Sequence, residues 1–372
     1  MKQRERAKFT NKDKSKFFNS LRANVDNYFI ENKLSKNANP HMVFKTIILL
    51  SAYFVPYALM LVFHMNTWLL ILNFAVMGTA MAGIGMSIMH DANHNAYSSN
   101  TTINRWLGYT INLMGGAVFN WKLQHNVQHH TFTNIHEMDD DIDSKLLMRF
   151  SPHSDRKGIH RFQHIYVFFF YSILTLYWAT LKDFVQLVAF KRNGTSRTNA
   201  AEFRKNLFLL IGGKLIYFAY MLFVPLFFFH YSVGAFIGAF LIMHAISGLI
   251  LSVIFQLAHT VEGTTYPMTN DKGVIENDWA IHQMATTVDF ARSSKFLTWY
   301  LGGLNFQVEH HLFPQVCHVH YTAISEIVKQ TAEEHGIPYL DNPTFWGAFM
   351  SHIRALKKFG SPPLHEVMDI AA

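Results

Sequence analysis

Four long apolar stretches, at residues 46–65, 68–88, 207–229 and 233–258, interrupt an otherwise polar and mixed sequence. A helix of about 20 apolar residues spans the roughly 30 Å of hydrocarbon in a bilayer. Only two or three residues join the two stretches of each pair, so the pattern predicts two tight transmembrane hairpins. We therefore expect an all-α integral membrane protein with four transmembrane helices.

Positive charges predict how these helices are oriented. Every Lys and Arg except Lys214 lies within residues 1–45, 89–206 or 259–372. Because basic residues remain on the cytosolic side of membranes, these regions are expected inside the cell. We expect one domain over residues 1–372, with a basic N-terminal segment at 1–45. The cytosolic helical cap of this domain would comprise residues 89–206 and 259–372.

Two further apolar stretches, 103–118 and 165–181, are shorter or are interrupted by polar residues. If 165–181 crossed the membrane, three crossings would separate His130 from His310 and place two histidine clusters on opposite faces. Both stretches are therefore predicted to be interfacial helices or to be buried in the cap.

The composition restricts the chemistry to histidine and carboxylate ligands. Half of the 372 residues are hydrophobic and 15% are charged, and there are 22 histidines but only one cysteine, Cys317. A single cysteine excludes an intrachain disulfide and a cysteine-rich metal site. The net charge of +7 is not accompanied by a nucleic-acid recognition motif, so we attribute it to membrane topology.

Eight of the 22 histidines form three clusters and one isolated position. The first cluster is His90 and His94, the second is His125, His129 and His130, and the third is His310 and His311, preceded by Gln307. His259 ends the fourth apolar stretch, on the same side of the membrane. In an α-helix, residues four apart share one face, whereas His130 would turn a further 100° beyond His129.

Eight imidazoles exceed what one tetrahedral zinc ion can use, so the clusters predict two metal ions. Imidazole-rich sites of higher coordination suit iron, although zinc or copper competes by intrinsic affinity. We expect Asp91 and Asp143 to accept hydrogen bonds from ligating imidazoles, and Asn126 to orient water or imidazole. The alternative is that these carboxylates are solvated parts of the cap.

The clusters resemble the histidine boxes of the membrane fatty acid desaturases, HxxxH, HxxxHH and a final HxxHH or QxxHH. Glutamine at the start of the third box is similar to front-end, linoleoyl-CoA-desaturase-like and sphingolipid-type members. The resemblance implies an oxygen-dependent di-iron oxidase that forms a cis double bond in a fatty acyl chain, carried as acyl-CoA or acyl-lipid. It implies as ligands His90, His94, His125, His129, His130, His259, His310 and His311. Gln307 would ligate a metal, act through water, or only form a hydrogen bond.

Many eukaryotic front-end enzymes carry a fused cytochrome domain with an HPGG-like haem loop, and this sequence has no such loop. Electrons are therefore expected from a separate ferredoxin or cytochrome. Three alternatives remain open: a di-iron lipid hydroxylase, a sphingolipid desaturase and, more distantly, a membrane metal transporter. The histidine motifs do not separate desaturation from hydroxylation.

Other features of the apolar stretches have two interpretations each. His244 lies deep in the fourth stretch, either bonded to a neighbouring helix or lining the end of a substrate tunnel. Small residues permit close helix approach or leave room for an acyl chain. The glycines concerned are at positions 78, 83, 85, 234, 238 and 248.

Overall fold

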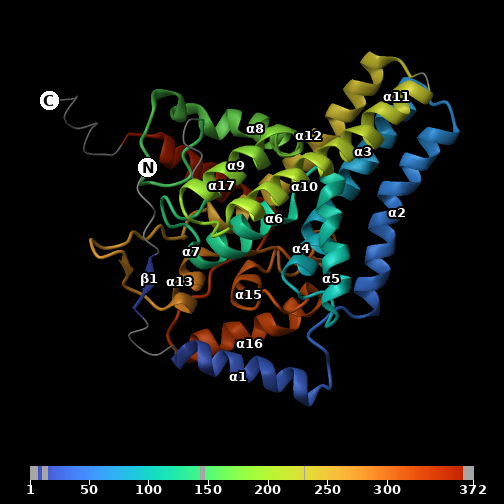
Figure 1. The fold of residues 1–372 in the computed structure, drawn as a ribbon. Helices are drawn as coiled ribbons and strands as arrows, with labels where there is room; N and C mark the ends of the chain where they lie inside the picture. Colours follow the sequence, from blue (N-terminus) through green and yellow to red (C-terminus); the bar gives the residue numbers. More distant parts are fainter. Residues whose placement is uncertain (1–6, 11–15, 143–146, 230, 363–372) are drawn as a thin grey trace.

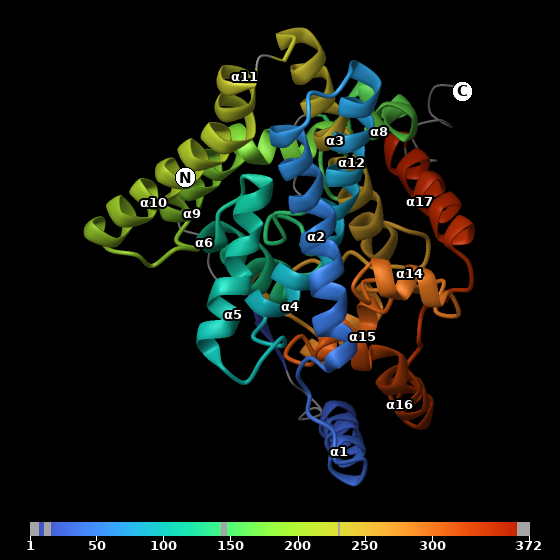
Figure 2. The same ribbon diagram turned by 90° about the vertical axis from the view of Figure 1, so that its right-hand side faces the viewer.

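The computed structural model of the protein describes residues 7–10, 16–142, 147–229 and 231–362 (Figures 1 and 2). The described chain is mostly helical, which agrees with the predicted all-α membrane protein apart from two pairs of two-residue strands. Among the described residues, five helical stretches are long and apolar enough to cross a membrane. They are Pro40–Val62, Thr67–Asn93, Gly158–Arg192, Ala200–Phe228 and Val233–His259.

Four of these stretches contain the apolar segments predicted to cross the membrane. The first is α2 (Pro40–Val62), and the second runs through α3 (Thr67–Gly83), η1 (Ile84–Ile88) and α4 (Met89–Asn93). The third runs through α10 (Ala200–Phe218), η6 (Ala219–Phe223) and α11 (Val224–Phe228), and the fourth is α12 (Val233–His259). Asn39 and Asn66 cap α2 and α3 by accepting backbone N–H bonds, so the polar residues between apolar stretches set where these helices begin.

The spanning helices pack closely where glycine removes a side chain. A Cβ atom at Gly78 of α3 would collide with the backbone of Met243 in α12. A Cβ atom at Gly248 of α12 would likewise collide with the backbone of Tyr171. These two glycines therefore permit close helix approach, whereas a Cβ atom at position 234 or 238 would meet open space.

The other helices, which include those of the fifth candidate span Gly158–Arg192, carry most of the histidines. Before the third spanning stretch these are α1 (Lys16–Glu31), α5 (Thr101–Gly108), η2 (Tyr109–Met114), α6 (Val118–Trp121), η3 (Lys122–His129), α7 (His130–Phe132), η4 (Gly158–Phe162), α8 (Gln163–Tyr177), η5 (Trp178–Lys182) and α9 (Asp183–Arg192). After α12 these are α13 (Trp279–Thr286), α14 (Lys295–Tyr300), α15 (Gln307–Leu312), η7 (His318–His320), α16 (Tyr321–Glu334) and α17 (Phe345–Gly360). Strand β1 (Lys8–Phe9) pairs in parallel with β2 (Val274–Ile275), and β3 (Asp289–Phe290) pairs in parallel with β4 (Asp341–Asn342).

The basic N-terminal segment is folded onto this part of the molecule. Helix α1 buries Phe17, Leu21, Val25 and Phe29, which recur every four residues and form one face. This face packs on α16, and both helices lie at the opposite end of the molecule from α11 (Figure 1). The apolar face of α1 is therefore used in tertiary packing.

The two stretches predicted to be interfacial have different structures. Residues 103–114 of the first stretch fall in α5 and η2, which end at Gly115 in the left-handed region with a φ of 74°, and Val118 begins α6. Residues 165–181 belong to the continuous stretch η4 to α9, which qualifies as a span by length and composition. The structure thus has five candidate spans where the sequence predicted four.

Two ionisable residues deep within the spans, His244 and Lys214, are both bonded to neighbouring elements. His244 contacts the hydroxyl of Tyr217 through Nε2 at 2.7 Å and that of Thr175 through Nδ1 at 3.0 Å. The ammonium of Lys214 donates to the carboxylate of Asp183 at 2.9 Å and to two backbone carbonyl groups at 2.8 Å. These contacts satisfy groups that would otherwise be costly in hydrocarbon.

Candidate metal centre

The first histidine box lies at the end of the second spanning stretch. His90 belongs to α4 and His94 follows it directly, and their rings lie 4.8 Å apart. The preceding segment η1 is a π-helix. Such wide turns occur mostly as local insertions within α-helices, frequently at functional sites.

The second box lies on the π-helix η3, a geometry that its sequence pattern does not predict. The backbone N–H of His130 donates to the carbonyl of His125, five residues earlier. In an α-helix, His130 would lie about 140° around the axis from His125. In the structure their rings are 4.7 Å apart, with His129 5.4 Å from His125. The wider turn therefore brings the whole second box to one face.

The third box is on the short helix α15, which a glycine turn holds against the first box. Gly302 has a φ of 64°, and any side chain there would collide with the backbone of Met86 in η1. This close approach positions His310 with its ring 4.4 Å from that of His90. His259, the last residue of α12, lies 4.9 Å from His311.

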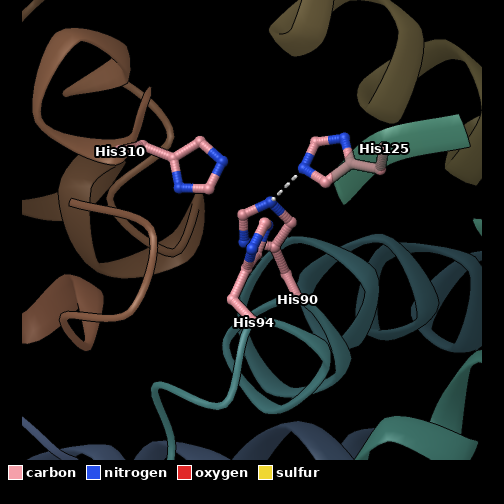
Figure 3. A group of neighbouring side chains, drawn as sticks. All are labelled: His90, His94, His125 and His310. Atoms are coloured by element: carbon pink, nitrogen blue, oxygen red, sulfur yellow. Dashed lines mark hydrogen bonds between the residues drawn. The ribbon is translucent and has the colours of Figure 1, made fainter. Parts of the chain in front are cut away.

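The eight histidines meet as two adjacent groups of buried nitrogens. His90, His94, His125 and His310 form the first group, and Figure 3 shows their rings converging from three elements. His129, His259 and His311 form the second group. In each group, one ring nitrogen per residue lies within 4.8 Å of the others. His130 lies between the groups, with its ring 4.5 Å from His310 and 4.4 Å from His311.

The Nε2 atoms of the histidine rings are positioned to bind metal ions rather than to form hydrogen bonds. Within the described residues, Nε2 has no hydrogen-bond partner in His94, His129, His259, His310 and His311. A buried polar atom without a partner is costly, so a ligand is expected there. Nε2 of His125 lies 3.1 Å from Nε2 of His90 and 3.2 Å from Nε2 of His130. Adjacent ligands of one ion with bonds of about 2.1 Å would have such a spacing.

The opposite nitrogens of several rings are held by neighbouring groups. Nδ1 of His129 lies 3.1 Å from Asp139, and Nδ1 of His310 lies 3.2 Å from the Tyr321 hydroxyl. His311 contacts the Gln283 amide oxygen at 2.9 Å in the same way. Nδ1 of His259 lies 3.3 Å from the carbonyl oxygen of residue 286. A proton fixed on Nδ1 leaves Nε2 as the lone-pair donor, which is the arrangement that metal-ligating histidines use.

The electrostatics of the site favour neutral imidazoles. Burial, together with the neighbouring rings, lowers the pKa of His94, His125, His130, His310 and His311 well below 6.5. Burial also opposes the charged form of His129, but the Asp139 carboxylate outweighs it and raises the pKa of that ring. Neutral imidazole is the metal-binding form of histidine.

The three residues predicted to support the ligands have different positions. Asp91 accepts from His318 at 2.7 Å and from the Cys317 thiol at 3.0 Å, so its carboxylate is held by residues that follow the third box. Asn126 donates to the carbonyl of Asn93 at 3.0 Å. Asp143 lies outside the described residues.

The sequence pattern does not single out the residues that contact the ligand rings. Asp139 and Asp143 belong to the same acidic run, and only the folded chain distinguishes Asp139. The pattern places Gln283 at the mouth of a substrate channel or in cap packing, and Tyr321 among three residues of which one would support a ligand, but it does not indicate that these two contact the rings. The signal available for Tyr321 is its position eleven residues after His310, on the other side of a turn.

Gln307 lies at the start of α15 and is 2% exposed. Its amide oxygen has no hydrogen-bond partner among the described residues, as for the free Nε2 atoms. Its side chain is near enough to His259 to affect the pKa of that ring, so the structure brings a buried residue with an available lone pair to the second histidine group.

Comparison with known proteins identifies close relatives. The model of the fatty acid desaturase family matches residues 66–343. An sn-1 linoleoyl-lipid 6-desaturase of Synechocystis sp. is 38% identical over 362 residues, covering 96% of this chain and 98% of the relative. An acyl-lipid (8-3)-desaturase of Physcomitrium patens is 37% identical over 347 residues, covering 92% and 72%. A probable Delta(5) fatty acid desaturase C of Dictyostelium discoideum is 32% identical over 362 residues, covering 94% and 77%.

Proposed function

The chain belongs to the fatty acid desaturase family, and we propose that it forms its cis double bond with two irons held by the two histidine groups. Its relatives are named acyl-lipid, linoleoyl-lipid and Delta(5) fatty acid desaturases, which supports a front-end acyl desaturase, an oxidoreductase of lipid metabolism. The observation that carries the proposal is the convergence of buried, unpartnered Nε2 atoms from all three boxes and from α12.

Each iron would have its own ligands. We assign His90, His94, His125 and His310 to the first iron, and His129, His259 and His311 to the second. His130 lies between the two groups and would complete one of them. The buried amide oxygen of Gln307 would serve as a ligand or hold a water molecule at the second iron.

The protein provides orientation and the exclusion of water around this chemistry. When bound, the irons would supply the activation of O2 and the removal of hydrogen from an unactivated methylene group. Asp139, Tyr321 and Gln283 hold the rings of His129, His310 and His311 with Nε2 free. All the ligand rings are at most 8% exposed, so bulk water has little access to the reacting atoms.

We propose that four helices cross the membrane, in two hairpins, and that η4 to α9 does not. Both ends of this fifth stretch are bonded to the histidine-bearing part of the chain. Gln163 donates to the carbonyl of Leu356 at 2.7 Å. Gln186, 23 residues later, donates to the amide oxygen of Gln124 at 2.7 Å and to Asp140 at 2.9 Å. If this stretch crossed the membrane once, its two ends would lie on opposite sides of the bilayer. They could not then both contact the histidine-bearing part of the chain.

This topology places the boxes in one cap, at residues 89–206 and 259–372, which the distribution of basic residues assigns to the cytosol. We propose a single domain that combines the stem and the cap, since the family match runs from 66 to 343 through both. Electrons would reach the irons from a separate ferredoxin or cytochrome, and the substrate would be an acyl chain carried by a lipid or by coenzyme A.

Lipid profiling of cells with and without the gene tests this function. We expect new unsaturated acyl chains in the wild type and none in the His310→Ala variant. A product that has gained oxygen would indicate a hydroxylase, and a new double bond confined to long-chain bases would indicate a sphingolipid desaturase. An unchanged lipid profile with altered cellular metal content would instead favour transport.

A further inference from the structure

Lys45 is buried inside the protein, although its place in the sequence predicts an exposed lysine. It is the last basic residue before the first apolar stretch, where lysine side chains usually extend towards the headgroups and the cytosol. Phe44 and Ile47 beside it are 63% and 58% exposed, whereas Lys45 is 2% exposed. A buried ammonium group is costly unless other groups compensate its charge. The side chain of Lys45 therefore needs partners within the fold.

The first partner of the Lys45 ammonium group is the imidazole ring of His318. Its Nζ lies 3.1 Å from Nε2 of His318, and 5.6 Å from the centroid of the Trp299 ring. Because an ammonium group is only a donor, Nε2 accepts and the ring proton is on Nδ1. Nδ1 of His318 then donates to the carboxylate of Asp91 at 2.7 Å. One imidazole thus connects a buried cation with a buried anion.

The Asp91 carboxylate joins two parts of the chain that carry ligand rings. Asp91 directly follows His90 in α4, and its carboxylate also accepts the backbone N–H of His318 at 3.3 Å. Three residues after His318, the hydroxyl of Tyr321 lies 3.2 Å from Nδ1 of His310. The contact between Asp91 and His318 therefore links the helix of the first box to the segment that holds a ring of the third box.

His318 is also packed tightly against the turn that leads into α15. A Cβ atom at Gly303 would lie 2.8 Å from Cβ of His318 and 3.0 Å from the ring of Tyr321. There is no room between the turn and these two residues. A change in the position of His318 would therefore be transmitted to the third box.

Two further contacts fix the start of α2 at the same place. The hydroxyl groups of Thr46 and Tyr97 lie 2.9 Å apart. The backbone N–H of Cys317 donates to the carbonyl of Lys36 at 2.8 Å. Residues from the N-terminal segment, from the end of the first box and from the chain after the third box thus meet around Lys45.

We propose that Lys45 is a positioning residue of the first histidine group, acting through His318 and Asp91. It would fix the spacing between the rings of His90 and His310, whose centroids are 4.4 Å apart. This inference rests on the proposed function, because those two rings would hold one iron. Without the ammonium group, Nε2 of His318 loses its donor and the ring is free to turn away from Asp91. The ligand spacing would then change although every ligand is present.

The single cysteine of the chain provides a test that needs neither iron nor turnover. The thiol of Cys317 is buried and donates to the Asp91 carboxylate at 3.0 Å. Its rate of reaction with a small maleimide would be measured on the full-length protein in nanodiscs. We expect Lys45→Met, which keeps a side chain of similar length, to raise this rate about tenfold. Lys214→Met removes another buried ammonium group and should leave the rate within about twofold.

Mössbauer spectroscopy of the iron-loaded protein tests the effect on the metal centre. Because the network adjoins the first histidine group, Lys45→Met should shift the quadrupole splitting of one iron and leave that of the other unchanged. We expect kcat to fall about tenfold with KM within about twofold. Lys45→Arg keeps a donor and should recover most of kcat. Lys45→Gln, with an amide donor on a shorter side chain, replaces Lys45→Met if that variant does not fold.

A double-mutant cycle tests whether Lys45 acts through the imidazole. His318→Asn keeps a donor beside Asp91 but no longer reaches Lys45. If Lys45 acts through His318, kcat of the double variant should be no lower than that of the slower single variant. Multiplied effects of the two substitutions would overturn the inference, because Lys45 would then act independently of the ring.

An unchanged Mössbauer spectrum in Lys45→Met would overturn the inference, with or without faster labelling of Cys317. Equal changes in Lys45→Met and Lys214→Met would also overturn it, because they would report a general loss of stability. If the wild type binds iron but desaturates no lipid, the proposed function fails, while the labelling rates and the spectra still decide the role of Lys45.

Discussion

The carboxylate of Asp139 lies 3.1 Å from Nδ1 of His129, opposite the Nε2 atom that has no partner among the described residues. The same carboxylate accepts the backbone N–H groups of Asn134 and Asp141 at 2.9 and 3.1 Å. Asp139 therefore connects the orientation of a ligand ring to the loop that follows the second box.

We expect Asp139→Asn to lower iron content or activity by about 10- to 100-fold, because such partners fix the ring and raise its basicity. Iron would be measured by mass spectrometry on protein in detergent, and desaturation in nanodiscs. Asp155→Asn, at an exposed carboxylate, is the matched control and should behave as the wild type. Full activity in Asp139→Asn would show that His129 needs no carboxylate.

Tyr321→Phe removes a hydroxyl group that lies 3.2 Å from Nδ1 of His310. Because the aromatic ring stays in the core, we expect the fold to be retained and kcat to fall about tenfold, the cost of roughly one hydrogen bond. Tyr177→Phe, at a tyrosine that is 41% exposed, provides the comparison. An unchanged kcat would mean that the hydroxyl group does not orient His310.

The role of Gln307 is tested by two substitutions of different chemistry. Gln307→Leu removes the buried amide oxygen and should lower activity by at least about tenfold with a partial loss of iron. Gln307→His restores a lone pair and should retain iron. Gln330→Leu, at an exposed site on α16, is the control. Wild-type activity in Gln307→Leu would leave the amide with a packing role only.

Burial lowers the pKa of His352 to about 4, from 6.5 in the unfolded chain. Between these values the unfolded state binds more protons, so stability is complete above about pH 6.5 and is lost as the pH falls towards 4. The contribution is about 3 kcal/mol. We expect the midpoint of thermal unfolding in detergent to fall less between pH 7.5 and 5 for His352→Gln than for the wild type. His335→Gln, at an exposed histidine, should leave this dependence unchanged.

The number of crossings is tested by placing single cysteines on either side of η4 to α9. Asp155→Cys and Arg197→Cys are exposed positions, and the native Cys317 is buried, so it gives little background. A membrane-impermeant maleimide should label both positions from the cytosolic side only. Labelling from opposite sides would mean that this stretch crosses the bilayer and that five helices span it.

The hydrophobic pattern is sufficient to find four of the five candidate spans among the described residues, because an apolar run of this length has few other stable locations. The fifth, Gly158–Arg192, contains an apolar stretch that the sequence predicted to be interfacial. The boxes are found because ligand spacing is local in sequence. The residues that contact the ligand rings are not found in this way, because Asp139, Gln283 and Tyr321 approach the histidines only after loops fold. Their sequence neighbours also have the same chemistry. The pairing of Lys214 with Asp183 escapes prediction for the same reason, because 31 residues separate them.

The π-helix η3 makes the second box depend on the winding of the backbone as well as on its histidines. One additional residue in the turn places His129 and His130 on either side of His125. If this segment had ordinary α-helical winding, the ring of His130 would lie about 140° around the axis from His125, although every histidine would survive. A substitution that replaced the wide turn by ordinary winding would therefore separate the last ring of this box from the metal centre without removing a single ligand.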